Sequence, residues 1–70
     1  SNNMFTKQAE EIINKDCITL HTKSLGYGFQ GFIIVRHEVT GKPIYTEYAH
    51  TIRVDINDAK QDAQEIKNSL

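Results

Sequence analysis

Glycines, histidines and one cysteine are the residues whose types and spacing could do chemistry. Gly26, Gly28 and Gly31 match the G-x-G-x-x-G pattern of dinucleotide-binding loops. Such a loop follows a strand and opens a helix, whose N-terminus holds the pyrophosphate. Here the glycines open the strand-like run 29–39, so we interpret them as a flexible loop and a close-packing point in a strand. The sequence therefore predicts no bound cofactor.

The histidines and Cys17 are too widely spread for a metal or a nucleophile. In the predicted sheet, His37 and His50 lie six residues apart along a strand, which is about 20 Å at roughly 3.3 Å per residue. One ion cannot bridge that distance. Cys17 and His21 lie four residues apart in an extended segment, so they do not make the hydrogen bond that a nucleophile and its base require. We predict no metal, no catalytic residue and no enzymatic activity.

Length and charge restrict the function further. The chain has 70 residues and a formal charge of −1, which allows one domain with a small core. Residues 1–3 are interpreted as the remnant of a removed tag, and residues 4–70 as a single small domain. A single cysteine favours a reducing, cytoplasmic location. No apolar run reaches the roughly 20 residues that span a bilayer, so no membrane contact is expected.

The periodicity of apolar residues predicts an α+β fold. An amphipathic helix is expected at residues 4–15, and a clearer one begins at Ile56, with Asp55 or Asn57 as its N-cap. Between them lie three strand-like runs, at residues 17–23, 29–39 and 44–54. The predicted order is a helix, a three-stranded antiparallel β-meander and a C-terminal helix packed on the sheet.

A turn signal at Thr40-Gly41 sets the predicted register of the second and third strands. A two-residue hairpin turn there would place Val39 opposite Lys42. One face of the sheet would then carry Phe29, Ile33 and Val35 opposite Ile52, Tyr48 and Thr46. The other face would carry Phe32, Ile34 and Arg36 opposite Ala49, Glu47 and Tyr45.

The second face decides the functional prediction. If both helices cover the first face, Phe32, Ile34 and Tyr45 remain exposed as a patch; if the N-terminal helix crosses over, they are core. We favour the exposed arrangement because Arg36 and Glu47 resist full burial. Aromatic and arginine side chains are enriched at interfaces. The sequence therefore predicts a non-enzymatic interaction module that binds a protein partner or a second copy through Phe32, Ile34, Arg36, Tyr45 and Arg53.

Nucleic-acid binding is the alternative. The element order, together with residues 58–63, resembles the double-stranded RNA-binding domains, and this resemblance implies phosphate contacts at the start of the last helix. That family has a lysine cluster there, whereas this chain has Asp55, Asp58 and Asp62 with only Lys60. Four cations and two carboxylates give residues 17–53 a charge of +2. The sheet therefore offers a second route to nucleic acid, through Lys23, Arg36, Lys42 and Arg53.

Overall fold

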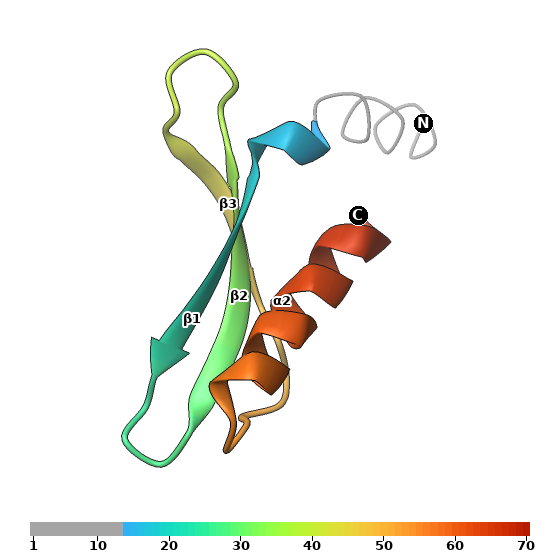
Figure 1. The fold of residues 1–70 in the computed structure, drawn as a ribbon. Helices are drawn as coiled ribbons and strands as arrows, with labels where there is room; N and C mark the ends of the chain where they lie inside the picture. Colours follow the sequence, from blue (N-terminus) through green and yellow to red (C-terminus); the bar gives the residue numbers. More distant parts are fainter. Residues whose placement is uncertain (1–13) are drawn as a thin grey trace, which may run out of the picture.

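The computed structural model describes residues 14–70. Three antiparallel strands form one sheet in the order β1-β2-β3, and a helix lies across one face of it (Figure 1). This confirms the predicted β-meander and C-terminal helix. Residues 4–13 of the predicted N-terminal helix lie outside the described residues, and so does the question of which face that helix covers. The elements in order are η1 (Lys15–Cys17), β1 (Ile18–Ser24), β2 (Phe29–Arg36), β3 (Pro43–Tyr48) and α2 (Ile56–Ser69).

Helix α2 begins where its sequence signals indicate. Asp55 has an extended backbone, and its side chain accepts a 2.8 Å hydrogen bond from the backbone N–H of Asn57. This satisfies one of the free amides of the first turn, so Asp55 is the N-cap. Ala59 and Ala63 are fully buried on the face that meets the sheet.

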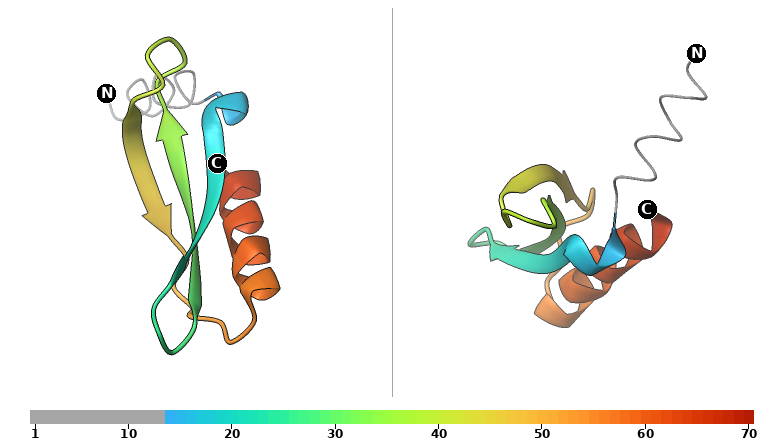
Figure 2. Two further views of the ribbon diagram at one scale, coloured as in Figure 1. Left: turned by 60° about the vertical axis from the view of Figure 1, so that its left-hand side comes forward. Right: turned by 90° about the horizontal axis from the view of Figure 1, so that it is seen from above.

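The core lies between α2 and the first two strands (Figure 2). Ile18, Ile33, Val35 and Ala63 form a buried cluster, and Ile66 packs against its edge. The two layers approach closely because β2 has no side chain at Gly31.

A Cβ at Gly31 would overlap the carbonyl oxygen of Ala59 in α2. The interpretation of a glycine in this strand as a close-packing point is thus confirmed. The site demands a glycine for close approach of two backbones, not for backbone conformation.

A tight turn joins β1 to β2. Gly26 has φ +84° and begins the two-residue turn, which the hydrogen bond from Leu25 N–H to Gly28 O closes at 2.8 Å. A positive φ at the first central position is typical of a type II′ hairpin turn. The G-x-G-x-x-G pattern therefore serves a hairpin, and no helix follows it.

The connection between β2 and β3 differs from the prediction. His37 N–H donates to Lys42 O, and Gly41 N–H donates to His37 O, both at 2.8 Å, so the loop has four residues and not two. The Nδ1 atom of His37 accepts from the amides of Val39 at 3.1 Å and Thr40 at 3.2 Å. This side-chain acceptor satisfies two amides inside the four-residue loop, which favours the longer loop.

The longer loop changes the register by one residue. Phe32 pairs with Tyr48 and Val35 pairs with Tyr45, with an irregularity between Val35 and Arg36. The predicted pairs Ile33–Tyr48 and Val35–Thr46 are therefore wrong. Because successive side chains in a strand point to opposite faces, a one-residue shift moves every side chain of β3 to the other face.

The third strand is also shorter than predicted. It ends at Tyr48, after which Ala49 N–H still donates to Gly31 O at 2.8 Å. Residues 50–52 then leave the ladder, and the chain rejoins β2 through a bridge between Phe29 and Arg53. The predicted pairing of Phe29 with Ile52 is therefore replaced by one with Arg53.

Candidate interaction surface

The sheet face that points away from α2 carries the best candidate site. Helix α2 packs on the opposite face, against β1 and β2, and no element of residues 14–70 packs over this one (Figure 2). Strand alternation and the observed register define its members. We call it the open face; it consists of Thr19, His21, Lys23, Gln30, Phe32, Ile34, Arg36, Thr46 and Tyr48.

Three rings lie side by side across the strands of the open face. His21 pairs with Phe32 in the β-ladder, and Phe32 pairs with Tyr48. The ring centroids are 5.1 Å apart for His21 and Phe32, with planes 18° apart, and 4.8 Å apart for Phe32 and Tyr48, with planes 32° apart. We call these three residues the aromatic row. Such cross-strand pairs stabilise a sheet and hold each ring in one orientation.

Neighbouring rings of the aromatic row pack against one another. Phe32, in the middle, is stacked on His21 and tilted against Tyr48, so an approaching molecule meets mainly ring edges, the phenol of Tyr48 and the imidazole of His21. The Nζ atom of Lys23 lies 5.3 Å from the centroid of the Tyr48 ring, within the range of a cation–π contact. The row is thus a preformed ridge with polar groups at its ends.

Hydrogen bonds fix the polar side chains around the row. The Thr19 Oγ1 and His21 Nε2 atoms are 2.7 Å apart, and Gln30 Nε2 donates to Ala49 O at 2.9 Å. Arg36 donates to Gly41 O at 3.2 Å, which ties it to the β2–β3 loop. Side chains that are already ordered lose little entropy on binding.

Tyr45 does not belong to the open face. It pairs with Val35, so it lies on the side of the sheet that carries α2, and it is 47% exposed. Its Oη donates to Glu47 Oε1 at 2.6 Å. This hydrogen bond, followed by burial and the negative charge of Glu47, raises the pKa of the Tyr45 phenol. The predicted patch of Phe32, Ile34 and Tyr45 is therefore wrong in its third member, and Tyr48 takes that place.

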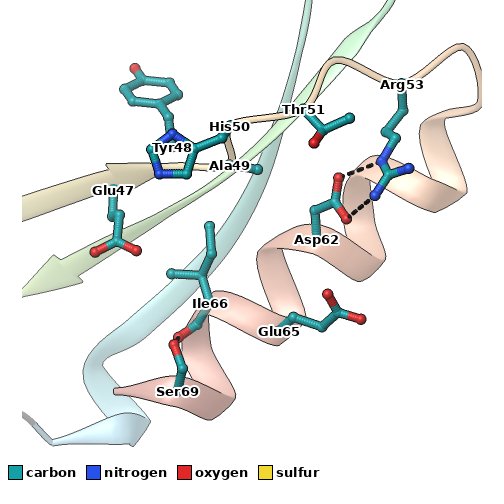
Figure 3. A pocket seen from close by; sticks show the side chains of 10 residues that line it. All are labelled: Glu47, Tyr48, Ala49, His50, Thr51, Arg53, Asp62, Glu65, Ile66 and Ser69. Atoms are coloured by element: carbon teal, nitrogen blue, oxygen red, sulfur yellow. Dashed lines mark hydrogen bonds and ion pairs between the residues drawn. The ribbon is translucent and has the colours of Figure 1, made fainter.

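Arg53 also lies away from the open face. Its Nε and Nη2 atoms donate to the two carboxylate oxygens of Asp62 at 2.7 and 2.9 Å, which links the loop after β3 to α2 (Figure 3). This paired hydrogen bonding raises the pKa of Arg53 and lowers the pKa of Asp62, against the opposing effect of desolvation. Arg53 therefore has a structural partner, and its predicted place at the edge of the patch is wrong.

The ion pair gives a pH-dependent prediction. Because the pKa of Asp62 is lower in the fold than in the unfolded chain, the pair contributes stability above about pH 4 and loses it as the pH falls through the folded pKa. We expect Asp62→Asn to unfold at lower urea concentration than the wild type at neutral pH. The difference in urea midpoint between wild type and Asp62→Asn should become smaller below about pH 4. Urea titrations followed by circular dichroism at several pH values measure it. A gap that stays constant into acid would contradict this.

The four cations predicted to contact nucleic acid do not gather in one place. Lys23 and Arg36 share the open face but lie near its opposite ends, separated by about 20 Å at roughly 3.3 Å per residue. Lys42 is exposed in the β2–β3 loop, and Arg53 is paired with Asp62 on the helix side. Two of the four therefore belong to the open face.

A shallow groove of about 350 Å³ lies between the end of β3 and α2 (Figure 3). Glu47, Asp62 and Glu65 make its lining acidic, but Asp62 is engaged by Arg53. The hydroxyl of Ser69 donates to the carbonyl of Ile66, 2.8 Å away. Within residues 14–70 no hydrogen bond joins a nucleophile to a base in this groove, so the open face is the better candidate site.

Neither a metal site nor a membrane segment is found in the described part of the chain. Among residues 14–70, no three histidine, cysteine, aspartate or glutamate side chains gather as a metal ion would require. No helix there is long and apolar enough to cross a bilayer. Comparison with protein-family models, curated proteins and solved structures found no match to this chain. A function for this chain must therefore be inferred from the geometry of the open face.

Proposed function

We propose that this protein is a small non-enzymatic interaction module that binds a protein partner with its open face. The observation that supports this most is the aromatic row, which runs across three strands and is left uncovered by every described element. Half-buried Phe32 and Ile34 supply apolar area, while Tyr48, 42% exposed, adds a hydroxyl at the edge. Aromatic anchors within a polar rim are typical of interface hot spots.

Charge supports a partner that is neutral or mildly acidic where it meets this surface. The open face carries Lys23 and Arg36 and no carboxylate, because the observed register places Glu47 on the other side of the sheet. Complementary charges increase the rate and specificity of association more than its affinity. The apolar row between the two cations is therefore expected to supply most of the binding energy.

Nucleic-acid binding remains the second candidate, favoured by the absence of carboxylates on the open face. It has less support than a protein partner. Proteins bind single strands by stacking bases on free aromatic faces, whereas the central ring of this row has a neighbouring ring on each side, one stacked and one tilted. We expect filter-binding titrations at low salt to show no retention of single-stranded or duplex nucleic acid. Retention that Lys23→Ala and Arg36→Ala both weaken would favour this candidate instead.

Two tyrosines on one strand provide a matched test of the proposal. Tyr48 and Tyr45 have similar exposure, 42% and 47%, but point to opposite faces. We expect Tyr48→Ala to reduce capture of a protein partner from an extract of the native cells about 30-fold, as removal of a hot-spot residue worth about 2 kcal/mol would. Tyr45→Ala should leave the capture unchanged.

Circular dichroism and thermal melting of both variants control for loss of fold. Equal loss of capture in the two variants, with both still folded, would show that the open face has no special role. Loss of capture in Tyr45→Ala alone would lead to the same conclusion. Either outcome would end the proposal.

A further inference from the structure

Strand β3 forms a free edge of the sheet. The order is β1-β2-β3, and within residues 14–70 no strand lies beyond β3 (Figure 1). Every side chain of the strand except Glu47 is exposed, and α2 packs against β1 and β2 instead. The opposite edge, β1, lies against α2. A free edge presents unpaired backbone N–H and C=O groups to solvent.

The direction of these backbone groups follows from the register. Ala49 N–H points to β2, because it donates to Gly31 O. In an antiparallel strand the backbone groups of alternate residues point to alternate sides. Glu47 and Tyr45 therefore direct their backbone groups to β2, whereas Thr46 and Tyr48 direct theirs to the free edge.

The free edge has few of the features that prevent pairing. Natural edge strands are protected by lysine, by proline within the strand, by bulges or by a covering element. In β3 the proline and the register irregularity lie at its beginning, around Pro43. From Tyr45 to Tyr48 the strand is regular, contains no lysine, and has Glu47 as its only charge.

The sequence of β3 is complementary to itself in antiparallel pairing. If Thr46 pairs with Thr46 of a second copy, Ile44 lies opposite Tyr48 and Tyr45 opposite Glu47. Thr–Thr pairs and pairs of a β-branched residue with an aromatic are favourable across strands. Each Glu47 then meets a phenol, whereas moving the centre of pairing to Glu47 would place two carboxylates face to face.

We propose that β3 pairs with β3 of a second copy of this chain, centred on Thr46, to form a six-stranded sheet. Self-association was predicted from the sequence to use the same face as partner binding. Pairing of the β3 edges leaves the open face free for a partner. Antiparallel neighbours in one sheet are related by a twofold axis perpendicular to it. The two open faces therefore lie on the same side and form one surface with two aromatic rows.

The test is the oligomeric state of the full chain and two edge variants. Sedimentation equilibrium over roughly a hundredfold range of concentration should show wild type moving from one to two chain masses. Thr46→Pro removes the N–H that points outward and is tolerated at an edge. Thr46→Lys keeps the N–H but places two lysines face to face. Both should remain folded and monomeric, while Thr51→Lys, at an exposed threonine outside β3, should dimerise as wild type does.

Amide exchange measured by NMR identifies the surface. The amides of Thr46 and Tyr48 should exchange more slowly as the wild-type concentration rises, whereas that of Glu47 should be protected throughout. A wild type that stays monomeric at every concentration, or a dimer that persists in both Thr46 variants, would overturn the inference. So would a dimer that Thr51→Lys also abolishes. Partner capture by the Tyr45 and Tyr48 variants is measured separately. Failure of the dimer test therefore does not contradict the proposed function.

Discussion

Replacing Gly31 with alanine should lower the free energy of unfolding by about 3 kcal/mol, as expected for an added methyl group with no space to occupy. The new Cβ would overlap the carbonyl oxygen of Ala59, which belongs to the backbone of α2 and cannot rotate away. The whole helix must therefore move off the sheet. A domain of this size has a total stability of the order of 5 kcal/mol, so the substitution would remove more than half of that stability.

Urea titration followed by circular dichroism measures this loss, and Gly41→Ala is its control. A Cβ at Gly41 would meet no atom within 4 Å, but its φ of +73° is unfavourable for alanine. That substitution should lower the free energy of unfolding by about 1 to 2 kcal/mol. If Gly31→Ala were no worse than Gly41→Ala, the close packing of α2 on β2 would be refuted.

The second large effect is expected at Ile33, the side chain at the centre of the core. Ile33 is fully buried between β2 and α2, so Ile33→Ala should lower the free energy of unfolding by about 2 to 5 kcal/mol through lost burial and the cavity left behind. Its neighbour Ile34 lies on the open face and is only half-buried. Ile34→Ala removes the same atoms and should have roughly half the effect or less.

This pair of variants reports on both faces of the sheet at once. Urea midpoints of the two variants, measured at one pH, give the comparison. Equal losses would mean that an element covers Ile34 as thoroughly as α2 covers Ile33. In that case the open face would be part of a core, and no partner could reach it.

The helix and the order of strands were predictable because their signals are local. In α2, Ala59 and Ala63 recur at helical spacing behind Asp55, a residue type that favours the N-cap position. Nothing outside that segment is needed to interpret the pattern. The strands follow in the same way from runs of β-branched and aromatic residues between glycines.

The membership of the candidate site was harder to predict because it depends on one loop. Thr40-Gly41 has the composition of a two-residue turn, but the imidazole of His37 accepts two loop amides and stabilises a four-residue connection. The resulting one-residue shift exchanges Tyr45 for Tyr48. His21 was missed for a related reason, since its stacking on Phe32 depends on the pairing of β1 with β2, which was not assigned residue by residue. A four-residue loop closed by His37 would have given the observed register, which places Tyr48 on the open face.

The role of Arg53 could not be predicted from spacing along the chain. Its partner Asp62 is nine residues away, across the connection that leads from β3 into α2. Such a pair forms only when the tertiary fold brings a loop against a helix face. Within a helix, spacing along the sequence predicts which side chains meet, at i, i+3 and i, i+4. No such spacing rule predicts a pair between a loop and a helix.

Site-specific photo-crosslinking tests the central claim, that the open face is the surface that binds a partner. Benzoylphenylalanine replaces Tyr48 in one sample and Tyr45 in another, and each is irradiated in native cell extract. The geometry predicts a discrete adduct with a different protein from position 48 and no adduct with a different protein from position 45, because only Tyr48 belongs to the aromatic row. An adduct with a second copy of this chain is expected from the edge pairing of β3 and is recognised by its mass. An adduct with a different protein from position 45, or the absence of such an adduct from both positions, would contradict the central claim.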